Sequence, residues 1–327
     1  MTEQASTGFH SILVTGGAGL VGSTTIDMLL DEPDCQRIVI LDNMVRGTRA
    51  NLQRALQDPR VELVEGDIRD ADLVQRLTDG MDAVIHMATL RITACAEHPR
   101  EAFEVMCTGS YNVVEAAQRA GVKKLVAASS ASIYGLADQF PTTEAAHPYQ
   151  NRTWYGATKI MLEGLLRSFN DMYGLPYVAL RYFNVYGPRM DIHGKYTEVL
   201  IRWMERIERG EPPLIFGDGS QTMDFVYIDD IARANLLSMV KPVSDEVFNV
   251  ASGTETSLRE LALALMDVMG RPDLQIEYGE ERKVNPVPRR LADTRKAEQL
   301  LGFTAQTGLH DGLRKLVAWW RAQREAA

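Results

Sequence analysis

The sequence has few of the residues that mark specialised classes of protein. Only three of its 327 residues are cysteines, Cys35, Cys95 and Cys107, and they form neither a CxxC pair nor a cluster with histidine. This odd and scattered set supports neither a disulfide framework nor a zinc site, so no bound metal is expected. We expect each cysteine to be a small buried or half-buried residue.

Long hydrophobic runs and concentrated positive charge are also missing. No segment reaches the roughly 18 consecutive apolar residues that a membrane-spanning helix needs. The first eight residues are polar and lack the apolar core of a signal peptide. A formal net charge of −9 argues against nucleic-acid binding, because neutralising phosphates requires clustered Lys and Arg. We therefore expect a cytoplasmic globular protein that binds neither membranes nor nucleic acids.

A glycine-rich turn lies near the start of the chain. An apolar run at residues 11–15 predicts a strand, the glycines Gly16, Gly19 and Gly22 follow at intervals of three, and a helical pattern comes next. This order is typical of a dinucleotide-binding turn, in which the glycines allow a tight turn and close approach of a pyrophosphate to a helix N-terminus. A purely structural turn has a similar pattern, so the glycines alone leave both interpretations open.

An acidic residue follows at the spacing that a dinucleotide site requires. The second apolar strand, residues 37–41, ends at Asp42, twenty residues beyond Gly22. A carboxylate there accepts hydrogen bonds from a ribose 2′-hydroxyl and repels a 2′-phosphate, which favours NAD over NADP. The nearby Arg46 and Arg49 keep NADP as an alternative.

Strand-like and helix-like segments alternate through the first half of the chain, which predicts a parallel sheet with helices on both faces. Further strands are expected at residues 61–68, 82–89, 124–128 and 177–182, and long helices at 99–120 and 155–173. Later segments predict helices at 196–209, 258–269 and 309–324 and short strands at 214–216, 225–227 and 247–250. We interpret 225–227 and 247–250 as returning to the main sheet.

These patterns predict an α/β protein with a Rossmann-type, doubly wound parallel sheet and a smaller C-terminal α/β substrate domain. We expect residues 1–188, with 222–252 returning to them, to form the NAD-binding domain. Residues 189–221 and 253–327 are then the substrate-binding domain.

Polar residues at the carboxyl ends of the predicted strands are candidates for the ligand crevice. His86 ends an apolar run, where a packed histidine is more common than a catalytic one. Ser129, Ser130 and Ser132 follow the fifth strand. They form either a turn or a row of hydroxyls in the crevice.

Tyr155 and Lys159 lie four residues apart on one face of a predicted helix. An ammonium beside a phenol favours the phenolate. For Tyr155 to act as a base at neutral pH, its pKa must fall by about 3 units from ~10, which takes roughly 4 kcal/mol. An exposed Tyr–Lys pair without a catalytic role is the alternative.

These motifs together resemble the extended short-chain dehydrogenase/reductase family, and within it the nucleotide-sugar epimerases of the UDP-glucose 4-epimerase type. The resemblance extends from Ile12 to about Trp320. It includes RYFNVYGPR at 181–189, FGDG at 216–219 and DFVY at 224–227.

The resemblance implies an enzyme that keeps NAD bound and recycles it. Tyr155 is then the base at the sugar 4-hydroxyl, Ser130 a hydrogen-bond partner of the 4-oxygen, and Lys159 the residue that holds the nicotinamide ribose and lowers the pKa of the tyrosine. Implied cofactor contacts, beside Tyr155 and Lys159, are Gly16, Gly19, Leu20, Val21, Gly22, Asp42, Asn43, Asp67, Ile68, Met87, Ala88, Ser129 and Phe183. Implied substrate contacts are Thr89, Arg91, Ser130, Ser132, Tyr155, Asn184, Val199, Phe216 and Lys283. A homodimer through the helices at 99–120 and 155–173 is also implied.

The residues after Ser130 favour epimerisation over elimination. Dehydratases of the family carry Asp-Glu there, because elimination needs an acid and a base, whereas this chain has Ala131 and Ser132. A nucleotide-sugar dehydratase or oxidoreductase with released cofactor, and a non-catalytic NAD-binding sensor, remain the alternatives. The complete set of Ser130, Tyr155 and Lys159 argues against the sensor.

Several positions depart from the family pattern on the substrate side. Met223 and Lys283 replace two arginines that reach the substrate diphosphate, Met106 replaces an asparagine near the nicotinamide, and Arg91 replaces an uncharged residue. Arg91, Arg152 and Lys195 either compensate for the lost phosphate contacts or indicate a different sugar nucleotide.

Overall fold

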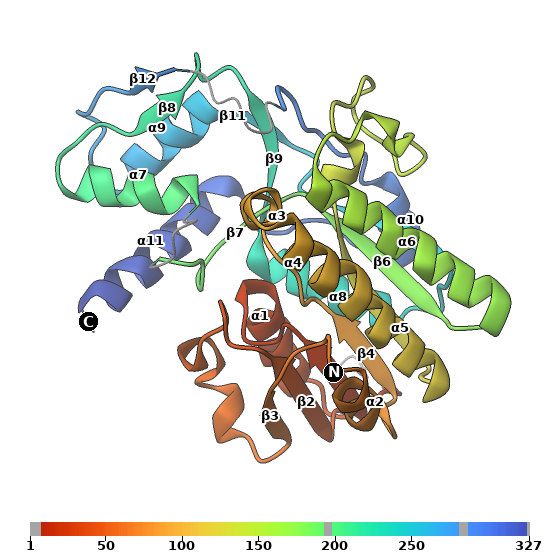
Figure 1. Ribbon diagram of the computed structural model, residues 1–327. Helices are drawn as coiled ribbons and strands as arrows, with labels where there is room; N and C mark the ends of the chain where they lie inside the picture. The colour runs from red at the N-terminus through yellow and green to blue at the C-terminus, as the bar shows by residue number, and fades with distance from the viewer. Residues whose placement is uncertain (1–7, 193–197, 281–286, 326–327) are drawn as a thin grey trace.

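Seven parallel strands form the main sheet of the computed structural model, which describes residues 8–192, 198–280 and 287–325 (Figure 1). In spatial order they are β10, β6, β5, β4, β1, β2 and β3. Their bounds are β1 (Ser11–Thr15), β2 (Arg37–Asp42), β3 (Val61–Glu65), β4 (Ala83–His86), β5 (Lys124–Ser130), β6 (Tyr177–Tyr182) and β10 (Glu246–Val250). The order reverses between β1 and β4, which confirms the predicted Rossmann-type sheet and places the ligand crevice at their carboxyl ends.

Helices cover both faces of this sheet because alternate side chains of each strand point to opposite sides. In β1, Ile12 and Val14 belong to the hydrophobic cluster beneath α1 (Leu20–Leu30) and α8 (Ile228–Val240). Leu13 belongs to the cluster beneath α2 (Ala71–Thr78), α5 (Ser110–Arg119) and α6 (Trp154–Tyr173). All three cysteines are buried and free, as predicted.

The expected single helix over residues 99–120 has a different form. The structure has α3 (Ile92–Glu97), then α4 (Pro99–Phe103), a π-helical stretch over Glu104–Gly109, and α5. A π-bulge adds a residue to the helical turn and frequently occurs at functional sites. Here it contains Met106, whose surroundings are described below.

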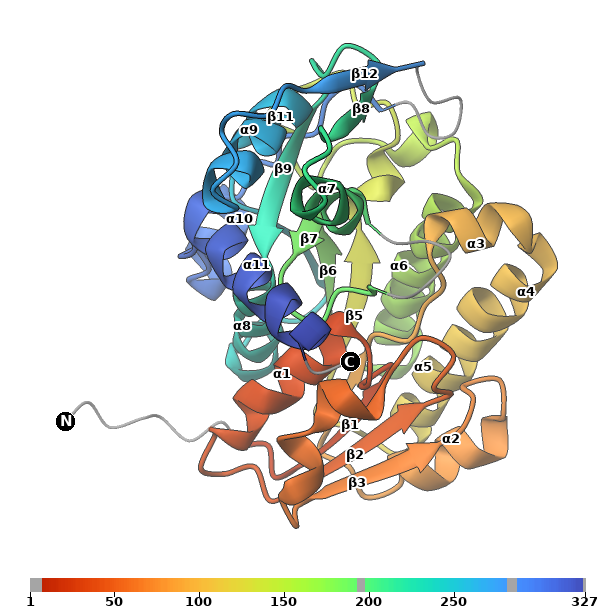
Figure 2. The same ribbon diagram turned by 90° about the vertical axis from the view of Figure 1, so that its left-hand side faces the viewer.

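The remaining elements form a smaller α/β part beside the crevice (Figure 2). Two small sheets, β11–β9–β7 and β12–β8, lie with the helices α7, α9 and α11. The short helix α10 (Arg295–Leu301), which precedes α11, packs against β10. The bounds are β7 (Asn184–Tyr186), α7 (Val199–Glu208), β8 (Leu214–Phe216), β9 (Thr222–Tyr227), β11 (Glu255–Ser257), α9 (Leu258–Val268), β12 (Glu277–Gly279) and α11 (Leu309–Glu325).

One strand prediction is wrong. Residues 247–250 return to the main sheet as part of β10, but 225–227 belong to β9, which pairs with β7 and β11. The apolar character of the segment is that of any buried strand, so it does not specify the sheet. No helix in the described part of the chain is both long and apolar enough to span a bilayer.

Candidate active site

The turn between β1 and α1 is built for close approach of an anion. Gly16 has φ +71°, and a Cβ there would lie 2.6 Å from the backbone nitrogen of Ala88. A Cβ on Gly22 would lie 2.4 Å from the carbonyl oxygen of Gly16. Gly19 caps α1, and no side chain hydrogen-bonds the amides of its first turn, to which Leu20 and Val21 belong. These amides are therefore available to a phosphate at the positive end of the helix.

The carboxylate at the end of β2 is held in place beside this turn. Asp42 is buried, and its two oxygens accept hydrogen bonds from the backbone amides of Ala18 and Met44, each at 2.9 Å. Arg49, one of the two arginines that made NADP an alternative cofactor, forms an ion pair with Glu65 at 2.9 Å. Together with the glycine turn, this carboxylate fits NAD.

The residues expected on the adenine side lie next to Asp42. Asn43 donates a hydrogen bond to the carboxylate of Asp67 at 3.1 Å, and Arg69 binds the same carboxylate and is the main cause of its lowered pKa. The carbonyl of Ile68 accepts a hydrogen bond from Asn112 at 3.0 Å. The structure thus brings Asn43, Asp67 and Ile68 together after β2 and β3.

The end of β4 contributes backbone rather than catalytic side chains. The amide of Met87 donates to the carbonyl of Thr15 at 3.0 Å, and Ala88 lies directly against Gly16. His86 is buried between the hydroxyls of Thr15 and Ser110, at 2.7 and 2.9 Å, and burial lowers its pKa to about 3. His86 is therefore a packed, neutral histidine, as predicted.

The two serines that end β5 point in different directions. The hydroxyl of Ser130 accepts a hydrogen bond from the amide of Ser132 at 3.1 Å and is hydrogen-bonded to Tyr155. The hydroxyl of Ser129 instead donates to the carboxylate of Glu163 on α6. The expected row of hydroxyls is thus divided, and the Ser129 side chain is committed to a contact within the protein.

Tyr155 and Lys159 lie in the first turns of α6, whose N-cap Thr153 accepts a hydrogen bond from the amide of Gly156. The Nζ of Lys159 is 5.8 Å from the Tyr155 ring centroid and donates to the carbonyl of Ala128 at 2.7 Å. Burial lowers the pKa of Lys159 to about 8.

The expected lowering of the Tyr155 pKa by Lys159 is not seen. Burial raises the pKa of Tyr155, and the groups that oppose this are the hydroxyls of Ser130 and Thr89 and the guanidinium of Arg290. The physical reason is that the desolvation of the phenolate outweighs these interactions, while the Lys159 ammonium is held by a backbone carbonyl.

Met106 joins three elements around Tyr155. Its sulfur accepts hydrogen bonds from the thiol of Cys95 at 3.5 Å and from the hydroxyls of Thr158 at 3.6 Å and Thr89 at 3.7 Å. Thr89 is in turn hydrogen-bonded to Tyr155. The sequence identified Met106 only as a departure from the family pattern, because a methionine at helical spacing is ordinarily a core residue.

Two arginines from distant segments, Arg46 and Arg290, interact electrostatically with Tyr155, and Arg91 interacts with Arg46. Arg91 precedes α3 and pairs with Glu198 at 2.9 Å. Desolvation lowers the pKa of Arg46, whose charge interacts with Arg91 and Tyr155. Arg290, which sequence reasoning missed, interacts with Tyr155 as well, and burial lowers its pKa to about 10. No local motif surrounds Arg290, so only the fold reveals it.

The remaining predicted cofactor residue, Phe183, and the other predicted substrate residues are more dispersed. Phe183 is buried and Asn184 half-buried at the start of β7, while Val199 begins α7. Phe216 ends β8 with 37% of its surface exposed. Lys283 and Lys195 lie outside the described residues. Arg152 stacks on Tyr149, with the guanidinium carbon 5.8 Å from the ring centroid.

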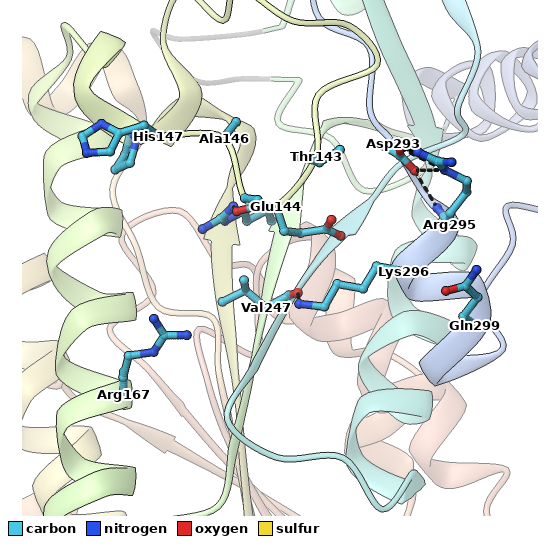
Figure 3. Close-up of a pocket in the computed structure, with 13 residues that line it drawn as sticks. Thr143, Glu144, Ala146, His147, Arg167, Val247, Asp293, Arg295, Lys296 and Gln299 are labelled. Atoms are coloured by element: carbon cyan, nitrogen blue, oxygen red, sulfur yellow. Dashed lines mark hydrogen bonds and ion pairs between the residues drawn. The ribbon is translucent and has the colours of Figure 1, made fainter.

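A cavity of about 710 Å³ lies elsewhere, between α6, the ends of β6 and β10, and α10 (Figure 3). None of the predicted site residues lines it. Its cationic side chains have acidic partners: Arg181 pairs with Glu163, Arg295 with Asp293 and Lys296 with Glu246. These charges are satisfied within the protein, so the cavity does not define the active site.

Comparison with known proteins agrees with this arrangement. A family model described as the NAD-dependent epimerase/dehydratase family matches residues 12–251. A UDP-glucose 4-epimerase of Mycolicibacterium smegmatis is 36% identical over 312 residues, which are 94% of this chain and 98% of the relative.

Two solved structures have nearly the same fold. The UDP-glucose 4-epimerase of Thermotoga maritima with UDP-glucose superposes with a TM-score of 0.89 at 34% identity, covering 96% of this chain and 99% of that one. The UDP-N-acetylglucosamine 4-epimerase of Methanobrevibacter ruminantium, in complex with UDP-N-acetylmuramic acid, gives a TM-score of 0.90 at 32% identity, again covering 96% and 99%.

Proposed function

Because the chain belongs to the NAD-dependent epimerase/dehydratase family of nucleotide-sugar enzymes, we propose that it is a 4-epimerase of a UDP-sugar of the glucose/galactose type. The observation that carries the proposal is that Ser130 contacts Tyr155 while the two residues that follow Ser130, Ala131 and Ser132, have no carboxyl group. Ala131 is buried, and the amide of Ser132 is bound to Ser130. Elimination of water would need a proton donor at these positions.

The side chains have distinct tasks in this reaction. The Tyr155 phenolate takes the proton of the sugar 4-hydroxyl as that oxygen becomes a carbonyl, and later returns a proton to it. Ser130 and Thr89 hydrogen-bond the tyrosine oxygen and orient it. The glycine turn and Asp42 would hold NAD, which when bound would supply a reversible hydride acceptor for carbon 4. Lys159, whose Nζ donates to the carbonyl of Ala128, would hold the nicotinamide ribose.

Turnover with a tyrosine variant tests the proposal. The purified protein incubated with UDP-glucose is expected to form UDP-galactose without net accumulation of NADH. Tyr155→Phe is expected to lower kcat at least 100-fold, the usual contribution of a positioned acid–base group. Tyr173→Phe, at an exposed tyrosine of the same helix, is the matched control and is expected to retain full activity.

Other products would contradict the epimerase. Stoichiometric release of NADH indicates a net oxidoreductase, and a 4-keto-6-deoxy product indicates a dehydratase. Retention of NAD with no turnover of any sugar nucleotide supports the non-catalytic sensor. Undiminished turnover by Tyr155→Phe would refute the mechanism.

We also propose that residues 1–188 with 222–252 hold NAD and that 189–221 and 253–327 hold the nucleotide of the substrate. The return of β10 and α8 to the main sheet layers supports the first assignment, whereas β7 and β9, which lie within the same ranges, pair in the smaller three-stranded sheet. The grouping of α7, β8, α9 and β12 outside those layers supports the second.

We propose further that the protein is a homodimer through α4, α5 and α6, which lie together along one side of the molecule (Figure 2). These helices expose large apolar side chains: Phe103, Tyr111, Trp154, Met172 and Tyr173. Exposed large apolar side chains on neighbouring helices are common at subunit contacts.

Light scattering after size exclusion tests the dimer. The wild type is expected at about twice the 36.5 kDa chain mass, and Tyr111→Glu at the mass of one chain. Leu263→Glu, on the exposed face of α9, is the control and is expected to remain dimeric. A monomeric wild type would refute this part of the proposal.

A further inference from the structure

A fully buried asparagine on α8, Asn235, lies between α1 and the end of β6. The helix α8 packs against both of these elements (Figure 1). A buried side-chain amide has one oxygen that accepts hydrogen bonds and one nitrogen that donates two, and leaving them unpaired is costly. The partners of Asn235 therefore show what this side chain holds in place.

The two polar atoms of the Asn235 amide contact three other parts of the fold. Its Oδ1 accepts a hydrogen bond from the hydroxyl of Tyr182, at the end of β6, at 2.6 Å. Its Nδ2 donates to Oγ1 of Thr25 on α1 at 3.1 Å and lies 3.9 Å from the sulfur of Met87, just after β4. Tyr182, Thr25 and Met87 are buried as well. One side chain thus joins α8 to α1, to β6 and to the segment after β4.

The direction of each hydrogen bond is fixed by the groups involved. Burial raises the pKa of Tyr182, so its hydroxyl keeps the proton and donates it to Asn235. The hydroxyl of Thr25 donates its single proton to the carbonyl of Val21 at 2.9 Å, so toward Asn235 it is the acceptor. The bonds therefore form one continuous chain from Tyr182 through Asn235 and Thr25 to Val21.

The two ends of this hydrogen-bond chain lie at the two halves of the candidate active site. Val21 belongs to the first turn of α1, whose amides are available to a phosphate. Tyr182 is the strand partner of Ser130 where β5 pairs with β6, and Ser130 contacts Tyr155. The chain thus connects the dinucleotide turn with the level of the sheet at which Ser130 and Tyr155 lie.

We propose that Asn235 is a positioning residue for the cofactor, which holds the first turn of α1 through Thr25 and fixes that turn relative to Ser130. A dinucleotide bound at the turn has to bring its nicotinamide to Tyr155, so a shift of the turn displaces the whole cofactor. Residues behind a site that hold its ligand-binding groups in place contribute to affinity by such preorganisation. The proposal concerns NAD binding and does not depend on which sugar the enzyme converts.

The neighbouring Thr24 offers an internal comparison on the same helix. Its hydroxyl donates to the carbonyl of Leu20 at 3.0 Å, in the same way as Thr25 donates to Val21. Thr24 is only half-buried, and within the described residues its side chain has no hydrogen bond to another element. The two threonines therefore differ in the bond from Asn235.

Exchange of bound NAD for radiolabelled NAD in the purified holoenzyme tests the positioning role. Thr25→Val removes the hydroxyl and keeps the shape, and it is expected to speed exchange by about 2- to 10-fold, the contribution of one hydrogen bond. Thr25→Ser retains the hydroxyl and should exchange NAD at the wild-type rate. Thr24→Val is the matched control and should also exchange at the wild-type rate.

A double variant separates positioning from stability. Asn235→Leu leaves the buried hydroxyl of Tyr182 unpaired, so it should lower the urea midpoint and speed NAD exchange by about 10-fold. Tyr182→Phe/Asn235→Leu removes that unpaired hydroxyl, and its urea midpoint should return toward that of the wild type. Its NAD exchange should remain fast, because Thr25 still lacks the bond from Asn235.

Three results would overturn the inference. If NAD exchange in the double variant returns to the wild-type rate together with stability, Asn235 serves only the fold. Equal acceleration by Thr24→Val and Thr25→Val would show that the bond from Asn235 is irrelevant, and a wild type that holds no NAD would remove the premise. None of these measurements uses a sugar nucleotide, so failure of the proposed epimerase activity would be seen separately.

Discussion

The buried ion pair between Arg181 on β6 and Glu163 on α6 offers a sharp test of how the site is supported. Two hydrogen bonds join the guanidinium to the carboxylate, at 2.6 and 2.9 Å, and the side chains are only 8% and 13% exposed. The same guanidinium donates to the hydroxyl of Tyr134 at 2.8 Å, and the carboxylate accepts from Ser129. Replacing Arg181 by Met therefore leaves a buried carboxylate without its cation.

The expected loss is large because the remaining charge stays desolvated. Removal of one member of a buried pair costs about 3–5 kcal/mol, a factor of roughly 10²–10⁴ in the folded-to-unfolded ratio. The double variant Arg181→Met/Glu163→Gln removes both charges and keeps a hydrogen-bond acceptor for Ser129. It is expected to lie within about 2 kcal/mol of the wild type, so that the two substitutions are strongly coupled.

Urea unfolding followed by tryptophan fluorescence measures these differences. The control is Arg271→Met, because Arg271 makes the same two-bond contact with Asp273 at the surface, at 2.9 and 3.0 Å. An exposed pair of this kind contributes at most about 1 kcal/mol. The reasoning is refuted if Arg181→Met costs no more than the control, or if the double variant loses the sum of the single losses.

Three further outcomes are expected. Met106→Leu removes the sulfur that accepts three hydrogen bonds and should lower kcat by about 2- to 10-fold without changing the amount of NAD that copurifies. The control Met204→Leu, on the buried face of α7, should leave kcat unchanged. Gly22→Ala places a Cβ against the preceding turn and should abolish NAD retention. The control Gly164→Ala, where a Cβ meets open space, should retain NAD and gain about 0.5–1 kcal/mol of stability. Burial lowers the pKa of Lys159 to about 8, so the folded protein binds fewer protons than the unfolded chain between pH 8 and about 10.5. Between these pH values the free energy of unfolding of the wild type should therefore rise with pH, relative to that of Lys159→Met, by up to about 1.4 kcal/mol per pH unit. Urea unfolding at several pH values measures both proteins, and the same pH dependence in both would contradict the lowered pKa of Lys159.

Local patterns in the sequence predicted the cofactor half of the protein well. The strand–glycine–helix order at Gly16 to Gly22 and the position of Asp42 depend on residues close together in the chain, and the structure has the elements in the predicted order. The packed character of His86 also followed from its place at the end of an apolar run. Backbone constraints and short-range spacing act locally, so a sequence records them directly.

Predictions that depended on sheet partners or helix continuity were less successful. Residues 225–227 have the composition of a buried strand, but the path of the chain puts them in β9 beside β7 and β11. The helix over residues 99–120 contains a π-helical stretch that its apolar periodicity did not indicate. Both features are decided by packing against distant elements, which overrides local preference.

The sequence by itself determined the dinucleotide turn, the acidic residue after β2 and the Ser130, Tyr155 and Lys159 set, because each is a spacing within one or two consecutive elements. Only the tertiary structure decided that the Ser129 hydroxyl binds Glu163 and does not face the crevice. It also decided that Arg290 interacts electrostatically with Tyr155, which lies 135 positions earlier in the chain. Long polar side chains reach several ångströms from their backbone, and their targets depend on how separate elements are assembled. The dinucleotide turn is therefore encoded locally, whereas the electrostatic interaction of Arg290 with Tyr155 is a property of the folded chain.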